Sequence, residues 1–225
     1  NEEQKIEFFG GGFFEGNQAW SKNKEIKTLL YQSVTGHIFF DSIEPCDKDL
    51  DPRIEKGDEK FILPIQNYQN IDQYLELFSS KRRSNLKRAF KKLHENNLQI
   101  KPGNEKDLDI LFNLNIKRFG DESVFTNPKR VESFIKMTKL PNQWKIITFT
   151  INNKVEAVSL STLYQNTYLY HNAGTNLSDY PNLGSLVIYQ NIKRAIELKA
   201  NYFDAGSEDL GWKSRWHLQP VQLYK

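Results

Sequence analysis

The chain has 225 residues, of which 38% are hydrophobic and 26% are charged, and its formal net charge is +3. This composition is typical of a folded globular protein and excludes an intrinsically disordered chain. A net charge so close to zero argues against a protein whose main task is to coat DNA. Cys46 is the single cysteine, so no internal disulfide is expected. No Cys/His grouping has the spacing of a zinc site, and we predict no metal site.

No apolar run in the sequence approaches the length needed to cross a bilayer. No signal peptide is visible either. We therefore expect a cytoplasmic protein without a transmembrane segment. The chain begins at Asn1 rather than at a methionine, so a targeting segment ahead of it would not be seen.

The first part of the chain contains a glycine-rich aromatic stretch at 8–14, FFGGGFF. No Lys-Ser or Lys-Thr pair follows it, so a turn between apolar segments is favoured over a phosphate-binding loop. Residues 26–34 and 37–43 are read as two strands. Thr35-Gly36 would join them in a hairpin.

Residues 46–59 are polar, contain Pro52 and Gly57, and are expected to form a surface loop. A short strand is expected at 61–65. The apolar spacing at 70–78 then predicts a helix. The composition changes at 79–81, which makes this the best candidate for a domain boundary, with residues 1–80 on one side and 81–225 on the other.

A basic run follows that boundary, and Ser79 or Ser80 is suited to begin a helix there. Four apolar residues would share one face of this helix, and seven basic residues would occupy the rest. The basic residues are Lys81, Arg82, Arg83, Lys87, Arg88, Lys91 and Lys92. Three interpretations remain open: a solvated face, a site for a phosphate or carboxylate, and a nucleic-acid surface. The last one lacks the interleaved aromatic residues that would stack on bases.

The remaining elements are easier to place. They are a strand at 98–101, helices at 105–119 and 128–140, strands at 144–151, 155–164 and 167–173, a helix at 183–200, a strand at 202–205, a short helical segment at 209–217 and a strand at 221–224. Gly120 is expected to end the first of these helices. Tight turns at 152–154 and 165–166 are expected to make the three central strands an antiparallel meander.

This order of elements resembles the GNAT acyltransferase fold over about residues 60–225. Within that superfamily it is similar to BioF/CelD-like acetyltransferases and to FemABX-type relatives, which add amino acids to peptidoglycan precursors. Lys81, Arg83, Asn85, Leu86 and Lys87 match the pattern of basic, Asn and aliphatic residues in the Fem-type proteins. The segment NLGSLVIYQNIKRAIELKANYFDAGSEDLGWKSRW is similar to their helix, strand and terminal Lys/Arg-aromatic segment.

The resemblance implies an α+β fold with a mixed, mainly antiparallel sheet flanked by helices. Residues 81–225 would be the acyltransferase domain. Residues 1–80 would be a partial GNAT-like α/β subdomain or an accessory one.

The resemblance also implies that acetyl-CoA or another acyl-CoA is the co-substrate, held where the helix at 183–200 begins. The residues matching the coenzyme-binding loop are Asn182, Leu183, Gly184 and Ser185. Free N–H groups in a first helical turn favour an anion. Pro181 and Leu186 depart from the family pattern. Gly184 is also compatible with a role in helix packing alone.

Three residues are candidates for the catalytic machinery: His171, Glu208 and Asp204. A neutral histidine can accept a proton near pH 7, although His171 is also compatible with a structural role on a strand. Asp204 is better suited to orienting another group. Glu208 and its neighbour Asp209 would either orient an amine or cap the short helix that follows. Tyr168, Tyr170 and Tyr189 are all candidates for the acid that protonates the leaving group.

Six residues are expected to bind the acceptor: Lys81, Arg83, Asn85, Lys213, Arg215 and Trp212. The resemblance assigns the basic members of this set to a carboxylate or phosphate of the acceptor, for which Arg is suited to bidentate contact. Trp212 and Trp216 would flank that site, although aromatic residues at helical spacing are more often part of a core.

The leading hypothesis is an acyl-CoA-dependent N-acyltransferase, most simply an acetyltransferase. Its acceptor would be an amine of a small molecule, an amino sugar or a cell-envelope precursor. One alternative is a FemABX-type peptidyltransferase that uses aminoacyl-tRNA, and only this case would make tRNA a partner. Another is a non-catalytic GNAT-like module that binds a ligand or a partner protein. DNA is not expected as a partner.

Overall fold

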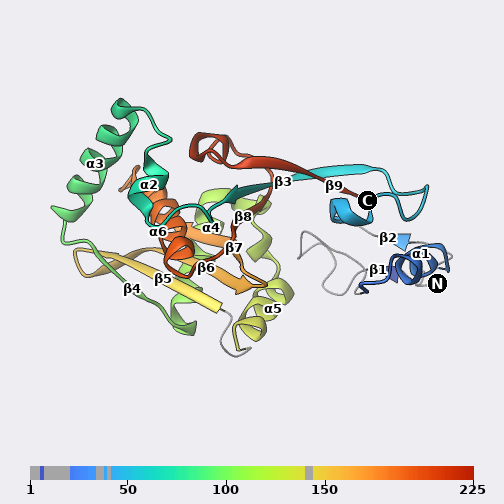
Figure 1. Ribbon diagram of the computed structural model, residues 1–225. Coiled ribbons are helices and arrows are strands. Elements are labelled where there is room, and N and C mark those ends of the chain that lie inside the picture. The colour runs from blue at the N-terminus through green and yellow to red at the C-terminus, as the bar shows by residue number, and fades with distance from the viewer. Residues whose placement is uncertain (1–5, 8–20, 34–37, 40–41, 140–143) are drawn as a thin grey trace. The chain divides into compact units, whose positions relative to one another are not determined.

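The computed structural model describes residues 6–7, 21–33, 38–39, 42–139 and 144–225 (Figure 1). The chain forms two compact units, one made of residues 64–204 and the other of residues 1–63 and 205–225. The glycine-rich stretch at 8–14 and the turn expected at Thr35-Gly36 lie outside the described residues. The domain boundary expected between residues 80 and 81 stays a prediction.

The larger unit contains five helices and most of the sheet among its described residues. Its elements are α2 (Ile71–Leu75), α3 (Ser80–His94), β4 (Gln99–Pro102), α4 (Leu108–Phe119), α5 (Pro128–Thr138), β5 (Trp144–Ile151), β6 (Lys154–Tyr164), β7 (Thr167–Thr175), α6 (Leu183–Glu197) and the first half of β8 (Tyr202–Ser207). The order expected from residue 98 onward is confirmed, but the short helical segment expected at 209–217 covers only Ser214–Trp216.

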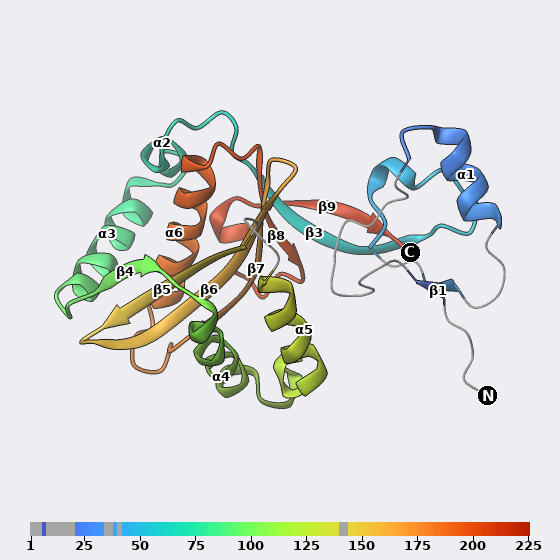
Figure 2. The same cartoon turned by 90° about the horizontal axis from the view of Figure 1, so that it is seen from below.

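The described strands include a seven-stranded sheet in the order β4-β5-β6-β7-β8-β3-β9, where β3 is Lys56–Pro64 and β9 is Gln219–Tyr224. Neighbouring strands from β4 to β7 are antiparallel, whereas β7 and β8 are parallel. In the larger unit, α3 and α6 lie on one side of β5–β7, and α4 and α5 lie on the other (Figure 2). The expected α+β fold with a mixed, mainly antiparallel sheet is confirmed.

Local sequence signals explain why these elements end where they do. Ser79 caps α3 by accepting a hydrogen bond from the backbone N–H of Arg82. Gly120, with a φ of 57°, follows the last residue of α4. Asn152 and Asn153 both have positive φ angles, of 48° and 64°, which suits the tight hairpin between β5 and β6.

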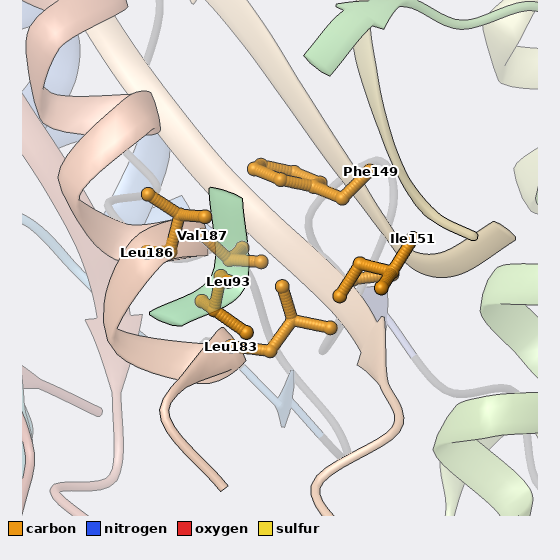
Figure 3. Packing of buried hydrophobic residues seen from close by; sticks show 7 residues of the cluster. Leu93, Phe149, Ile151, Leu183, Leu186 and Val187 are labelled. Carbon is orange, nitrogen blue, oxygen red and sulfur yellow. The ribbon is translucent and has the colours of Figure 1, made fainter. Parts of the chain in front are cut away.

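The core of the larger unit lies between α6, α3 and the sheet (Figure 3). Leu183, Leu186 and Val187 of α6 pack in one cluster with Phe149 and Ile151 of β5. Leu93 of α3 and Ala157 of β6 complete its fully buried members. Burying this many apolar side chains ties the start of α6 firmly to the sheet, at roughly 1.5–3 kcal/mol for each large side chain.

A buried polar network adds specificity to the packing of α6. The side-chain amide of Asn191 donates to the hydroxyl of Ser159 (3.0 Å) and to the carbonyl of Val187 (2.8 Å). Its oxygen accepts from the hydroxyls of Ser161 and Tyr168, each at 3.0 Å. Because every polar group of Asn191 has a partner, its burial carries little penalty, and it fixes the register of α6 on β6 and β7.

Gly174 lies within β7, one residue beyond the strand end expected at 173. The backbone of Leu111 in α4 approaches it so closely that a Cβ at position 174 would lie 2.8 Å from the Cα of Leu111. Glycine is needed here because two backbones meet, not because the chain turns.

The smaller unit contains α1 (Lys24–Ser33) and two short parallel strands, β1 (Ile6–Glu7) and β2 (Ile38–Phe39). In this unit β3 and β9 form an antiparallel pair. The strand expected at 26–34 is wrong, because α1 covers residues up to Ser33. The side chain of Asn23 accepts a hydrogen bond from the N–H of Glu25 (2.8 Å), which starts the helix. The loop expected at 46–59 is shorter than predicted, since β3 begins at Lys56.

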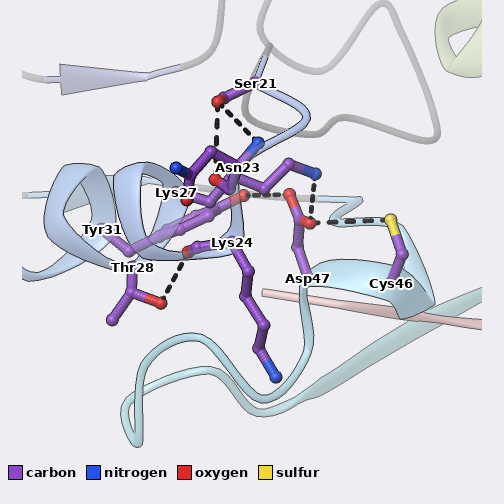
Figure 4. A network of polar contacts seen from close by, with 8 residues as sticks. All are labelled: Ser21, Asn23, Lys24, Lys27, Thr28, Tyr31, Cys46 and Asp47. Carbon is purple, nitrogen blue, oxygen red and sulfur yellow. Dashed lines mark hydrogen bonds and ion pairs between the residues drawn. The ribbon is translucent and has the colours of Figure 1, made fainter.

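A buried carboxylate links α1 to the segment that follows β2 (Figure 4). Asp47 accepts hydrogen bonds from the ammonium of Lys27 (2.7 Å) and the hydroxyl of Tyr31 (3.2 Å). The Sγ atom of Cys46 lies 3.6 Å from the Oδ1 atom of Asp47. Partial burial and the charge of Asp47 raise the pKa of this thiol. The thiol is therefore kept protonated, which does not suit a nucleophile.

Within the described ranges, none of the helices combines the length and the apolar character needed to cross a bilayer.

Candidate active site

The first turn of α6 has two features that favour an anion. Its N-cap residue, Asn182, makes no side-chain capping hydrogen bond, and the first turn carries no acidic residue. Gly184 and Ser185 belong to this turn, where backbone N–H groups have no partner within the helix. Together with the helix dipole, these groups favour a phosphate or carboxylate.

The two leucines of this segment are buried in the core. Leu183 is fully buried, and Leu186 is only 1% exposed within the core cluster. The bulk of Leu186, which departs from the family pattern, therefore lies in the core and not over the first turn. Gly184 also serves packing, because a Cβ at this position would come within 3.3 Å of the Leu177 side chain.

His171 lies at a β-bulge, where the register between β6 and β7 shifts from Leu160 opposite Asn172 to Ser161 opposite Tyr170. A bulge re-aims the side chain of the extra residue. The Nε2 atom of His171 is 2.8 Å from the hydroxyl of Thr162, and its ring packs against Trp144 at 5.3 Å between centroids. Burial lowers the pKa of His171 to about 4, so the imidazole is neutral at pH 7 and able to accept a proton.

Two of the three catalytic candidates share one face of the sheet. Successive pairing places Trp144 beside Thr162, Thr162 beside Leu169, and Leu169 beside Asp204. The side chain of Tyr168 bonds to Asn191 of α6, so it points to the α6 side of the sheet. Successive side chains of a strand alternate, so Leu169 and the residues paired with it, Thr162 and Asp204, face the α4 and α5 side. His171 contacts the hydroxyl of Thr162. The sheet therefore brings His171 and the buried Asp204 to the same face on adjacent strands.

Glu208 and Asp209 belong to the smaller unit, and both are exposed. Asp209 accepts hydrogen bonds from the backbone N–H groups of Gly211 (2.8 Å), Lys213 (3.0 Å) and Ser214 (3.4 Å). These bonds lower its pKa although partial burial opposes them. Asp209 therefore holds the turn that leads into the short helix Ser214–Trp216, and its bond to the N–H of Ser214 is the part of this arrangement that fits a capping role. Glu208, the residue before Asp209, has a positive φ of 61°.

Replacing Asp209 by alanine should leave these N–H groups without their acceptor. We expect the free energy of unfolding to fall by about 1 kcal/mol, as for other lost caps. Urea unfolding of the two proteins at pH 7 measures the difference. Asp209→Asn keeps an acceptor oxygen and should recover most of the loss, so an equal loss in both variants would contradict the capping role.

Lys213 is buried rather than exposed, at 2%. Its ammonium donates to the carbonyls of Gly206 (2.7 Å) and Ser207 (2.5 Å), and it lies 5.1 Å above the ring of Phe61. Trp212 provides a second ring at 5.8 Å. These contacts stabilise a buried cation and hold the end of β8. Arg215 is exposed, and its Nε atom donates to the carbonyl of Gly211.

The three acceptor-binding candidates of α3 lie in its first two turns. Lys81 and Asn85 are exposed, and Asn85 accepts a hydrogen bond from Arg88 (3.0 Å). Arg83 is half-buried and donates to the carbonyl of Phe78 (2.5 Å). The acceptor-binding roles of these residues, of Lys213, Arg215 and Trp212 stay predictions.

The tyrosines are poor proton donors in this arrangement. Burial raises the pKa of Tyr168 to about 12 and also raises the pKa values of Tyr170 and Tyr189. The hydroxyl of Tyr168 is already engaged with Asn191. Tyr189 packs against Phe90 of α3.

Glu156, which is not among the residues predicted from the sequence, is a buried acid that contacts the loop before α6. Its side chain is bonded to Asn176 (2.7 Å) and to Lys154 (3.0 Å). One signal was available: Glu156 is the single acidic residue of the strand KVEAVSLSTLY. Its partner lies 20 residues further along the chain, and no local pattern identifies it. In the part of the chain that the structure describes, no group of three or more His, Cys, Asp or Glu residues is placed to hold a metal ion.

The sequence of the chain matches a known protein family. The model of the acetyltransferase (GNAT) domain matches residues 80–214, more than half of the chain. The chain belongs to the GNAT acetyltransferase domain family. The expected family is thus confirmed, and the GNAT match assigns the chain to a family of acyltransferases.

Solved structures support the GNAT fold. The C-terminal domain of a protein assigned as a lysylphosphatidylglycerol synthetase, from Agrobacterium fabrum, has a TM-score of 0.63 and 10% identity, with 88% of this chain and 69% of that chain covered. L-PGS from Bacillus licheniformis has a TM-score of 0.60 and 11% identity, with 89% and 70% covered. FemX has a TM-score of 0.57 and 11% identity, with 78% and 62% covered. At these identities the likeness concerns the fold alone. No curated protein sequence matches the chain.

Proposed function

We propose that this GNAT protein is an acyl-CoA-dependent N-acyltransferase, most simply an acetyltransferase, that acts on an amine. The observation that carries the proposal is the uncapped first turn of α6, to which the resemblance to GNAT enzymes assigns the donor. Backbone N–H groups of Gly184 and Ser185 would bind the pyrophosphate of the donor, and the hydroxyl of Ser185 would add a further donor group.

Acyl-CoA supplies an acyl group as a thioester. The nitrogen of the acceptor must lose a proton as it forms a bond to the acyl carbon, and the departing sulfur must gain one when the carbon–sulfur bond breaks. The imidazole of His171 is neutral at pH 7 and has a lone pair to take the proton from the amine, but burial, which lowers its pKa to about 4, makes it a weak base. Asp204, on the same sheet face, would orient the acceptor or the imidazole. Lys81, Arg83 and Asn85 would bind an anionic group of the acceptor, for example on an amino sugar or a cell-envelope precursor.

A second candidate keeps the fold and changes the donor to aminoacyl-tRNA, as in Fem-type relatives. The observation in its favour is the exposed basic surface of α3, formed by Lys81, Lys87, Arg88, Lys91 and Lys92. Such a surface is suited to a phosphate backbone. The two candidates differ in which polyanionic donor binds, so donor binding separates them.

Replacing Ser185 by aspartate is expected to weaken donor binding at least about tenfold, because a negative charge in the first turn repels the pyrophosphate. The same charge interacts favourably with the helix dipole, so the free energy of unfolding should rise by about 0.5 kcal/mol. Calorimetry with desulfo-CoA measures the first effect, and urea unfolding measures the second.

Ser185→Asn is the matched control, since asparagine has the shape of aspartate without the charge. It loses the serine hydroxyl but keeps a hydrogen-bond donor, so its affinity should fall much less than that of the aspartate variant. Equal affinity in the aspartate variant would place the donor elsewhere. If the wild type binds desulfo-CoA no better than millimolar, the acyl-CoA proposal is lost, and binding of aminoacyl-tRNA becomes the measurement to make. Binding of desulfo-CoA without any turnover of acetyl-CoA would favour a non-catalytic module.

A further inference from the structure

The loop between β7 and α6 is organised by a buried pair of side chains, Glu156 and Asn176. Both are largely inaccessible, at 4% and 6% exposure. Glu156 is the extra residue of a β-bulge, since Phe149 pairs with Ala157 and Thr150 pairs with Val155. The bulge directs its carboxylate to the loop, as bulges re-aim the side chain that they leave unpaired.

Asn176 is the centre of the hydrogen bonds in this loop. Its side-chain amide donates to Glu156 (2.7 Å) and to Asp179 (2.9 Å), while its side-chain oxygen accepts from the N–H of Asp179 (3.4 Å). Its backbone N–H donates to the carbonyl of Glu156 (2.9 Å), and its carbonyl accepts from the N–H of Tyr180 (3.2 Å). One residue thus binds both the strand behind the loop and the turn ahead of it.

The turn held by Asn176 leads directly into α6. The N–H of Leu183 donates to the carbonyl of Tyr180 (2.9 Å), and the side chain of Leu177 lies against Gly184. Hydrogen bonds of 2.7–3.2 Å and one packing contact therefore connect the carboxylate of Glu156 to the first turn of α6. A change at Asn176 would displace the backbone on the entry side of the helix.

We propose that Glu156 and Asn176 are positioning residues that hold the loop at 176–182, and with it the first-turn N–H groups of α6, in the conformation that binds the donor. This inference rests on the proposed function, because it assigns the donor to that first turn. Neither residue needs to touch the donor. Their effect is on how well the N–H groups are ordered before the donor arrives, which sets affinity.

The test is Asn176→Asp, which keeps the shape of the side chain and replaces its amide donor by an oxygen. A carboxylate at 176 would face Glu156 and Asp179 with no proton to share, so the loop should open. Hydrogen exchange of the amides at 176–186 should speed up, and the affinity for desulfo-CoA should fall at least about tenfold. In turnover the donor KM should rise while the acceptor KM stays within about twofold of its wild-type value.

The double variant Glu156→Gln/Asn176→Asp exchanges donor and acceptor across the pair. Glutamine at 156 can donate to aspartate at 176, whereas the aspartate still faces Asp179, so the slow exchange and the affinity should be restored in part. Asn127→Asp is the matched control, because Asn127 caps α5 through its side-chain oxygen and aspartate caps equally well. That variant should leave both measurements unchanged.

Faster exchange at 176–186 with unchanged donor affinity would overturn the positioning role. A double variant no better than Asn176→Asp would overturn the assigned exchange of hydrogen-bonding groups. If the wild type itself binds no desulfo-CoA, the proposed function fails and the donor role fails with it. In that case the exchange pattern still decides whether the pair holds the loop, so the two failures are distinguishable.

Discussion

Replacing Gly174 by alanine is expected to lower the free energy of unfolding by about 3 kcal/mol. The new methyl group would meet the carbonyl oxygen of Leu111 and lie 2.8 Å from its Cα and 2.9 Å from its carbonyl carbon. These are backbone atoms of α4, so no side-chain rotation relieves the clash, and the helix itself must shift. Overpacking that cannot relax usually costs 1–3 kcal/mol or more. Urea unfolding at pH 7 measures the change.

Gly184→Ala is the control for this experiment, since it adds the same methyl group at the start of α6. There the nearest atom is the Cδ2 of Leu177 at 3.3 Å, the end of a flexible side chain. Alanine also favours the helix over glycine by up to about 1 kcal/mol. The free energy of unfolding of this variant should therefore lie within about 1 kcal/mol of the wild-type value. Equal losses in the two variants would mean that α4 does not approach β7 as closely as described.

The elements from residue 98 onward are predictable because their local signals agree with their final environment. Asn152 and Asn153 adopt positive φ angles in the hairpin turn, and Gly120 adopts one directly after α4. Residues 26–33 are different, because a short aliphatic run fits a strand or a helix equally well. There the outcome depends on the cap from Asn23, together with the burial of Tyr31 against Ile43 and Leu50.

The candidate site is predictable only where its chemistry is local. The start of α6 follows from Gly184 and the apolar spacing after it, and both features are read from neighbouring residues. The burial of Lys213 depends on Phe61, some 150 residues earlier in the chain. The pairing of Glu156 with Asn176 depends on a bulge that shifts one residue out of register. Such contacts are set by tertiary packing, for which a single sequence has no periodic signal.

Acidification from pH 6.5 to pH 4 is expected to lower the free energy of unfolding by about 2–3 kcal/mol through His171 alone. Burial lowers the pKa of this histidine to about 4, whereas an unfolded chain binds a proton with a pKa near 6.5. Well above pH 6.5 this histidine is neutral in both states, so it does not affect the free energy of unfolding. Between the two values the unfolded state binds more protons, and stability falls as the pH falls.

His171→Gln removes the titrating group while keeping a side chain that can bond to the hydroxyl of Thr162. Its free energy of unfolding at pH 7 should lie within about 1 kcal/mol of the wild type. Its loss between pH 6.5 and pH 4 should be smaller than that of the wild type by about 2–3 kcal/mol. Carboxylates titrate in the same range, and the difference between the two curves isolates the histidine. The exposed His94 at the end of α3 supplies the control for removing a histidine as such, through His94→Gln.

The same pair of proteins tests the catalytic role of His171. If its imidazole accepts the proton of the amine, the kcat/KM of the wild type should lose activity on acidification through a pKa near 4 and not near 6.5, after correction for the titration of the acceptor amine. The glutamine variant should lose activity at every pH, by about 10²-fold for a general base. Full activity in a stable His171→Gln variant would make this histidine a structural partner of Thr162 and Trp144, and the base would then have to come from elsewhere on the face that carries Asp204.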